Sequence, residues 1–175
     1  MSNILIVYFS HKGETYFPDG YRVVEKGNAN IIAEKVQSLL NADIFEIRPV
    51  NKYPVSYKEC CEVAKEEYEK GTLPKLEEYL PNIKRYDTIV LVYPCWWGTI
   101  PQAMFTFLKK YDFKDKEIYP ICTHEGSAMG KSEIDLVNVC AKARIHRGLA
   151  IKGSKVNVCD ASLREYFMGL LMKEN

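Results

Sequence analysis

The sequence predicts an α/β fold in which five parallel strands form a doubly wound sheet, with helices on both faces. Two observations support this class. Apolar, β-branched segments alternate along the chain with segments whose apolar residues recur at helical spacing. The segment at residues 88–93, TIVLVY, is a nearly unbroken apolar run, as is typical of a strand buried on both faces of a parallel sheet. Right-handed crossovers then place the helices in two outer layers.

The first strand is predicted at residues 4–9, the apolar run ILIVYF, and ends at Ser10. In the long loop that follows, Pro18-Asp19-Gly20 is a turn signal between two aromatic segments, which predicts a small hairpin. A helix begins at residues 27–30. Its apolar positions recur at helical spacing: Ile32, Val36, Leu39 and Leu40. The next strand, at residues 43–47, alternates weakly, which indicates a place near an edge of the sheet.

A capping box at Ser56 and Glu59 opens the second helix, and Gly71 closes it. One face of this helix is predicted to join the core: Tyr57, Cys60, Cys61, Ala64 and Tyr68. An irregular surface connection at residues 72–84 leads to the strand at residues 88–93. Pro94 ends that strand because it has no N–H to donate.

A helix after Pro101 follows, with Met104, Phe105, Leu108 and Tyr111 as its apolar positions. The fourth strand is predicted at residues 117–123, and Pro120 argues against a central position for it. The fourth helix begins near Lys131, with Ile134, Val137 and Cys140 as its apolar positions. A short fifth strand at residues 144–151 contains Gly148. Asp160 then caps a last helix whose inward residues are Leu163, Phe167, Leu170 and Leu171.

Composition and charge exclude several classes of protein. Of the 175 residues, 47% are hydrophobic and 27% are charged, which is typical of a globular protein and predicts one domain over residues 1–175. The 24 basic and 23 acidic residues nearly balance, so we expect no nucleic-acid or membrane partner. With no apolar run of membrane-spanning length and no basic leader, a cytoplasmic location is expected. The six cysteines lack metal-ligand spacing, so we expect reduced thiols and no metal site.

Three loops should meet at the carboxyl edge of the strands, where open α/β sheets bind ligands. The first, residues 10–13, returns through residues 27–30 into a helix N-terminus, whose free N–H groups and dipole favour an anion. The second carries Trp96 and Trp97, whose large flat side chains suit a flat ligand. The third, residues 123–130, is rich in groups that could hold the polar edge of a heterocycle. Together the loops predict a site for a phosphate, a flat ring and the edge of that ring.

Two rival classes fit the residues less well. Residues 125–132, EGSAMGKS, approach the nucleotide-binding pattern G-x-x-x-x-G-K-[ST], but Glu125 stands where the first glycine is required. A phosphoacceptor receiver domain would need acidic residues after the first strand and an aspartate after the third. This chain has Ser10 and Pro94-Cys95 at those places, so neither class is expected.

The three loops resemble those of the flavodoxin-like superfamily, and closely those of its flavodoxin-type FMN-binding members. The similar segments are Tyr8-Phe9-Ser10, Gly27-Asn28, Pro94-Cys95-Trp96-Trp97-Gly98-Thr99 and Cys122-Thr123-His124-Glu125-Gly126-Ser127. The resemblance covers roughly residues 3–153. It implies the strand order 2-1-3-4-5 in a three-layer α/β/α fold, with FMN bound where the order reverses.

The resemblance also implies which residues hold the cofactor. The phosphate is expected at Ser10, His11, Lys12, Asn28, Ala29 and Asn30. The isoalloxazine ring is expected against Pro94, Cys95, Trp96, Trp97 and Gly98, with Trp97 or Trp96 stacking on it; Trp97 is our choice, and the other indole should pack against protein. The pyrimidine edge is expected against Thr123, His124, Glu125, Gly126 and Ser127. Two departures from the family pattern are notable: residues 14–26 interrupt the phosphate loop, and Ala29 stands where these proteins usually carry a hydroxyl.

The function implied is electron transfer through FMN. Electron-carrying flavodoxins are typically very acidic, whereas this chain is nearly neutral. A reductase of a small, quinone-like acceptor is therefore expected, with NAD(P)H or a redox protein as electron donor. A one-electron carrier and a flavin-free interaction module remain alternatives. His124 is a candidate acid or base, or it only hydrogen-bonds its loop. The oligomeric state stays open, a homodimer included.

Overall fold

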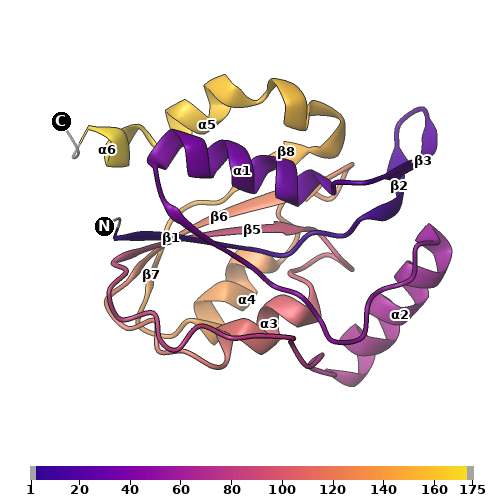
Figure 1. The fold of residues 1–175 in the computed structure, drawn as a ribbon, viewed down its shortest axis with the longest axis horizontal. Helices are drawn as coiled ribbons and strands as arrows, with labels where there is room; N and C mark the ends of the chain where they lie inside the picture. The colour runs from indigo at the N-terminus through magenta and orange to yellow at the C-terminus, as the bar shows by residue number, and fades with distance from the viewer. Residues whose placement is uncertain (1–2, 173–175) are drawn as a thin grey trace.

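The structure, a computed structural model, describes residues 3–172 and has a mostly parallel sheet as its centre (Figure 1). The strands are β1 (Ile4–Tyr8), β4 (Asp43–Glu46), β5 (Thr88–Pro94), β6 (Glu117–His124), β7 (Arg144–Ile145) and β8 (Leu149–Lys152). Their order is β4-β1-β5-β6-β7, with β8 also paired to β6, and every pair is parallel. The predicted order 2-1-3-4-5 is confirmed, except that the predicted fifth strand consists of two short strands, β7 and β8.

The expectation that Pro120 keeps its strand away from the middle of the sheet is wrong, because β6 lies between β5 and the β7–β8 pair. β7 pairs with Glu117 and Ile118, and β8 begins opposite Ile121, so Pro120 faces the gap between them. The Tyr166 hydroxyl fills that gap and lies 3.0 Å from the carbonyl oxygen of Pro120. The missing N–H of the proline therefore breaks no strand pairing on that side.

Helices cover both faces of the sheet, as predicted (Figure 1). α1 (Asn28–Leu40) and α5 (Asp160–Tyr166) lie on one face; α3 (Gln102–Leu108) and α4 (Ser132–Val139) lie on the other. Successive residues of β1 enter opposite cores: Ile4 and Ile6 pack with α1 and α5, whereas Leu5 and Val7 pack with α3. This two-sided burial explains the unbroken apolar runs of the central strands.

The last helices differ from the predictions in three ways. Ile134 and Val137 are 66% and 58% exposed, and α4 instead buries Ser132 and Leu136. Asp160 is the first residue of α5, and its carboxylate pairs with Lys35 at 2.7 Å instead of capping the helix. The predicted last helix is divided into α5 and α6 (Met168–Leu171), with the 3₁₀ helix η1 (Gly153–Val158) before them.

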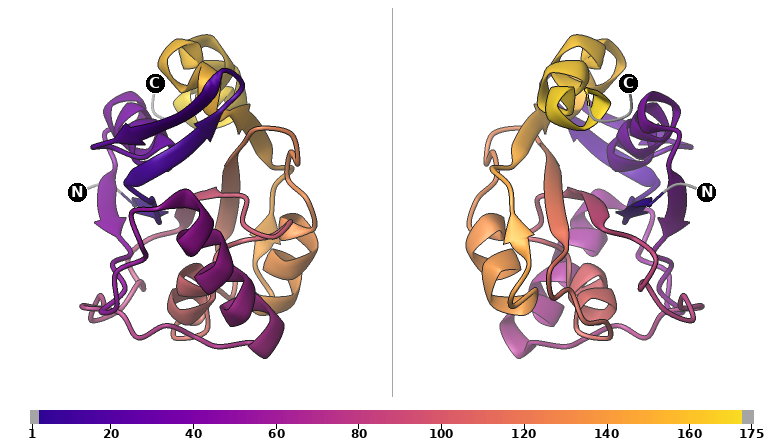
Figure 2. Two further views of the ribbon diagram at one scale, coloured as in Figure 1. Left: turned by 90° about the vertical axis from the view of Figure 1, so that its right-hand side faces the viewer. Right: turned by 90° about the vertical axis from the view of Figure 1, so that its left-hand side faces the viewer.

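The predicted hairpin is present as β2 (Gly13–Phe17) and β3 (Gly20–Val24), which form a separate antiparallel sheet. α2 (Tyr57–Lys70) begins at the Ser56 cap and ends at Gly71, as predicted. α2 packs against β2 and α3. Viewed from the carboxyl edge of the strands, α2 and the hairpin stand in front of the sheet (Figure 2, left). The fold therefore gives this edge two walls that a plain doubly wound sheet lacks.

The connection at residues 72–87 is irregular, as predicted, but it is not wholly on the surface. Leu76 and Ile83 are buried in the core on the α3 side of the sheet. Within residues 3–172, no helix has the length and apolar character needed to cross a membrane.

Candidate functional site

A pocket of about 400 Å³ opens at the carboxyl edge of β1, β5 and β6. Most of the predicted cofactor residues line it: Ser10, His11, Asn28, Ala29, Pro94, Cys95, Trp96, Trp97, Thr123, His124 and Glu125. The other predicted residues are not among those lining it: Lys12, Asn30, Gly98, Gly126 and Ser127. The three predicted loops therefore converge on one cavity, and its volume lies in the usual range for small-molecule sites.

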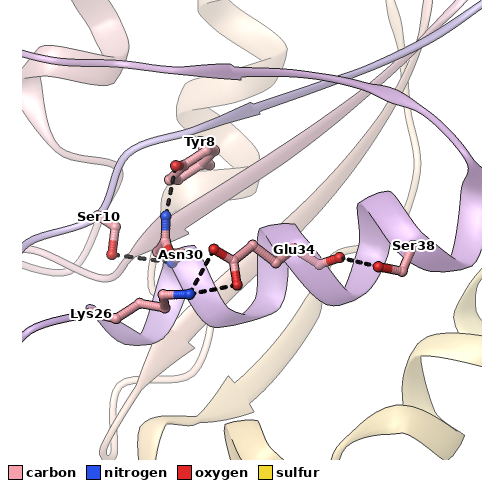
Figure 3. Close-up of polar contacts among 6 residues, drawn as sticks. All are labelled: Tyr8, Ser10, Lys26, Asn30, Glu34 and Ser38. Carbon is pink, nitrogen blue, oxygen red and sulfur yellow. Dashed lines mark hydrogen bonds and ion pairs between the residues drawn. The ribbon is translucent and has the colours of Figure 1, made fainter.

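One end of the pocket is built around the start of α1 (Figure 3). The Ser10 hydroxyl accepts a hydrogen bond from the Asn30 N–H at 3.1 Å, and the Asn30 side chain donates to the Tyr8 hydroxyl at 2.6 Å. Asn30 thus fixes the helix to β1. Because an α-helix leaves its first N–H groups without intrahelical partners, those of Asn28 and Ala29 are suited to an anion in the pocket.

The first loop lies so close to α1 that Gly27 is required between them. A Cβ at Gly27 would lie 2.2 Å from the His11 carbonyl oxygen and 2.3 Å from the Ser10 hydroxyl oxygen. Gly27 has an ordinary φ of −71°, so this requirement is steric. The close approach places Ser10 against the helix start despite the inserted hairpin.

Two histidines of the pocket each have a buried nitrogen without a hydrogen-bond partner among the described residues: His11 Nε2 and His124 Nδ1. Burial lowers the pKa of both side chains; Glu125 opposes this effect at His124, and Lys152 adds to it. Both imidazoles are therefore neutral near pH 7. Buried polar atoms without partners are uncommon in folded proteins.

The two tryptophans occupy different surroundings. Trp96 packs its ring edge-on against Phe9 and Tyr53, with ring centres 5.1 and 4.8 Å apart. Trp97 is 47% exposed, and its indole N–H donates to the Cys61 carbonyl at 3.1 Å. Trp96 is therefore half-buried in the pocket wall and packed against other aromatic rings, while the Trp97 ring is accessible at the mouth of the pocket.

A tight turn presents the Trp97 ring. Trp97 and Gly98 have φ values of 49° and 76°, both left-handed, and backbone hydrogen bonds in both directions join Trp96 to Thr99. The third loop lies against this turn, because the Lys131 N–H donates to the Gly98 carbonyl at 2.8 Å. The second and third loops thus form one packed unit.

In the third loop, the Glu125 side chain has a structural contact. Its carboxylate accepts the Ser154 N–H at 2.7 Å and so fastens the loop to η1. Thr123 is buried at the end of β6 and belongs to the wall of the pocket.

The thiol of Cys95 forms part of the wall and is stabilised as an anion. Interactions with the Cys122 thiol, the Ser127 hydroxyl and the Gly98 N–H lower the pKa of Cys95 to about 6, although burial opposes them. The same contact and burial raise the pKa of Cys122, which stays protonated. These interactions favour the thiolate form of Cys95.

A further wall of the pocket is made by β2 and α2, and sequence reasoning missed the part that α2 contributes. The residues of this wall are Glu14, Thr15, Tyr16, Tyr57, Cys60, Cys61 and Ala64. The α2 residues among these were expected in the core. Helical spacing of apolar residues does not distinguish a helix face in the core from one that lines a pocket. Only Cys60 and Ala64 of that face are buried, and Tyr68 is exposed.

Glu14 joins the hairpin to α2. Its N–H donates to the Val55 carbonyl at 2.8 Å, and its carboxylate accepts the N–H of Tyr57, the first residue of α2, at 2.9 Å. The Tyr16 and Tyr21 rings pack together with Tyr57 above this junction. The hairpin is thereby held as a wall of the pocket.

Glu14→Ala should release this wall. Loss of a carboxylate from a helix N-terminus costs about 0.5–2 kcal/mol. We expect a decrease of that size in the free energy of unfolding and faster amide exchange in residues 13–24. Asp19→Ala is the matched control, because Asp19 forms only an exposed ion pair with Arg22 in the same hairpin. Equal effects of the two substitutions would contradict the anchoring role of Glu14.

Comparisons with known proteins agree with this architecture. The sequence model of the Flavodoxin family matches residues 20–167. A putative flavoprotein from Bacteroides uniformis is 21% identical, with a TM-score of 0.76 over 94% of this chain and 97% of that one. Another, from Bacteroides eggerthii, is 22% identical, with a TM-score of 0.74 over 94% of each chain.

A flavoprotein from Lactobacillus acidophilus, solved in complex with FMN, is 18% identical, with a TM-score of 0.64 over 88% of this chain and 95% of that one. No curated protein sequence matches the chain. At these identities the solved structures establish the fold, and the match to the family model covers most of the sequence. The chain belongs to the flavodoxin family.

Proposed function

We propose that the chain binds FMN in this pocket and acts as a reductase of a small, quinone-like acceptor, with NAD(P)H or a redox protein as electron donor. The observation that carries the proposal is the convergence of a helix N-terminus, an accessible indole and the third loop on one cavity. A related fold, the Lactobacillus acidophilus flavoprotein, was solved with FMN.

The residues present fit such a cofactor. Ser10 and the first N–H groups of α1 would hold the phosphate, and a dianion there would favour a proton on His11. Trp97 would stack on the ring, and Thr123 with His124 would contact its polar edge. When bound, FMN supplies the capacity to accept a hydride and to pass electrons on. The walls from β2 and α2 would limit access to small acceptors.

Charge supports a reductase. Of the two carboxylates in the pocket wall, Glu14 accepts the Tyr57 N–H and Glu125 accepts the Ser154 N–H. Each negative charge is thus partly compensated by a backbone donor, which reduces its effect on an anionic reduced ring.

A one-electron carrier is the second candidate, and Cys95 favours it. A thiolate in the pocket wall adds a negative charge that would oppose the fully reduced, anionic flavin. Stepwise anaerobic photoreduction separates the candidates: little semiquinone together with NAD(P)H oxidation supports a reductase, and nearly complete semiquinone without NAD(P)H oxidation supports a carrier.

The cofactor itself is tested by reconstitution. The protein should take up FMN in preference to FAD and riboflavin, because the pocket has one anion site at a helix start. Mass spectrometry of the heat-released cofactor should identify FMN. Recovery of FAD would disprove the cofactor assignment. Failure to bind any flavin after reconstitution would favour a flavin-free interaction module.

A further inference from the structure

Cys95 and Cys122 come from the ends of two adjacent strands, β5 and β6, at the wall of the pocket. Cys95 follows the last residue of β5, and its N–H donates to the Thr123 carbonyl of β6 at 2.8 Å. Cys122 pairs in register with Tyr93, and Cys95 lies two residues beyond Tyr93, so both cysteines project from the same face of the sheet. Cys95 packs against the core cluster that contains Cys122, whose Sγ lies 3.7 Å from the Thr123 carbonyl oxygen.

The two sulfurs have opposite access and opposite protonation. Cys95 lines the pocket, whereas Cys122 is completely buried behind it. The three donors of Cys95 keep its sulfur as the nucleophilic thiolate, and the thiol of Cys122 keeps its proton. By contrast, burial raises the pKa of Cys60 and Cys140, to about 12 in each case, and disfavours their thiolates.

We propose that Cys95 and Cys122 form a peroxide-sensitive redox pair in the wall of this pocket. The Cys95 thiolate attacks one oxygen of hydrogen peroxide; the O–O bond breaks, Cys95 becomes a sulfenic acid, and the leaving hydroxide takes a proton to become water. The Cys122 sulfur then attacks the sulfenic sulfur. The S–S bond forms, the S–O bond breaks, and the hydroxide leaves with the Cys122 proton as a second water.

The balance is two thiols and one peroxide giving one disulfide and two waters, so the two electrons lost by the sulfurs reduce the peroxide. The strand register places Cys95 diagonally next to Cys122 on the same face of the sheet, against one core cluster. A disulfide requires them to approach to about 2.05 Å. Because Cys122 is shielded from solvent, peroxide reaches Cys95 first, and Cys122 acts as the resolving thiol.

The test uses the full, flavin-free chain treated with hydrogen peroxide, after which the remaining thiols are blocked with N-ethylmaleimide. We expect a mass lower by two hydrogens, two thiols protected from the label, and a peptide joining Cys95 to Cys122. A small thiol should reverse the change. Cys122→Ala should instead stop Cys95 at the sulfenic or sulfinic acid, and Cys95→Ser should abolish the fast reaction. Cys140→Ser is the matched control, since Cys140 is buried away from the pocket.

A second readout remains if Cys122→Ala folds poorly. Alkylation of Cys95 by iodoacetamide should have its midpoint near pH 6 in the wild-type chain. Ser127→Ala removes one donor and should slow alkylation at pH 6.5 by several-fold to about tenfold. The groups facing Cys95 are the thiol of Cys122, the hydroxyl of Ser127, the Gly98 N–H and the phenol of Tyr93.

If wild-type Cys95 is oxidised to a sulfinic acid and no disulfide forms, Cys122 is not the resolving thiol. If Cys95 is alkylated no faster than a simple thiol, it is not held as a thiolate. Added FMN should protect Cys95 if it binds in the pocket. A disulfide that forms equally well with FMN present would leave the redox pair intact and contradict the proposed position of FMN.

Discussion

Trp97→Ala is expected to weaken FMN binding by about tenfold or more and to leave the fold almost as stable as before. Stacking contributes about 0.5–1.5 kcal/mol beyond the area that it buries, and the loss of buried area adds to this. Trp97 is accessible at the mouth of the pocket and has one hydrogen bond to the protein, to the Cys61 carbonyl. The measurement is a fluorescence titration with FMN alongside a urea unfolding curve.

Trp96→Ala is the variant to compare with Trp97→Ala, because Trp96 packs against protein. Trp96 packs against Phe9 and Tyr53, and removal of a large aromatic side chain from a core costs about 3–5 kcal/mol. Because Trp96 is half-buried, a cost near the lower end is expected. Trp97→Phe is the conservative control and should retain most of the affinity. If both alanine variants change FMN affinity equally and negligibly, neither ring stacks on the flavin.

Gly27→Ala is expected to damage the phosphate end of the pocket and the fold together. The added methyl group would lie 2.2 Å from the His11 carbonyl oxygen, so the first loop must move away from α1. Overpacking of this kind costs about 1–3 kcal/mol of stability. Loss of one charge-assisted hydrogen bond to the phosphate, about 1.5–3 kcal/mol, would lower FMN affinity by about tenfold to a hundredfold.

Riboflavin and Gly169→Ala are the controls for this prediction. Riboflavin lacks the phosphate, so its affinity should fall much less than that of FMN. Gly169 lies in α6 and has no atom within 4 Å of an added Cβ, so Gly169→Ala should leave binding unchanged and raise stability by about 0.5–1 kcal/mol. Equal losses for FMN and riboflavin would mean that the phosphate does not bind at the start of α1.

Much of the fold and of the candidate site follows from local sequence pattern. The apolar runs at β1 and β5 indicated strands with both faces buried, and the order of strands followed from the alternation with helices. Local turn chemistry located the hairpin and the ends of α2. Because parallel strands end at one edge, the sequence also predicted that the three loops would meet.

The tertiary structure decided what covers each surface, since this depends on residues far away in the chain. Helical spacing identified the apolar face of α2, but only the docking of α2 beside β2 makes that face a pocket wall. Ile134 and Val137 have the same spacing and are exposed, because α4 turns Leu136 inward. Pro120 is tolerated inside the sheet because it faces the gap between β7 and β8, where Tyr166, from another layer, bonds its carbonyl. The sequence by itself determined the helices and strands and their order. Tertiary packing determined what lies against each face of these elements, because a side chain is buried only where another element covers it.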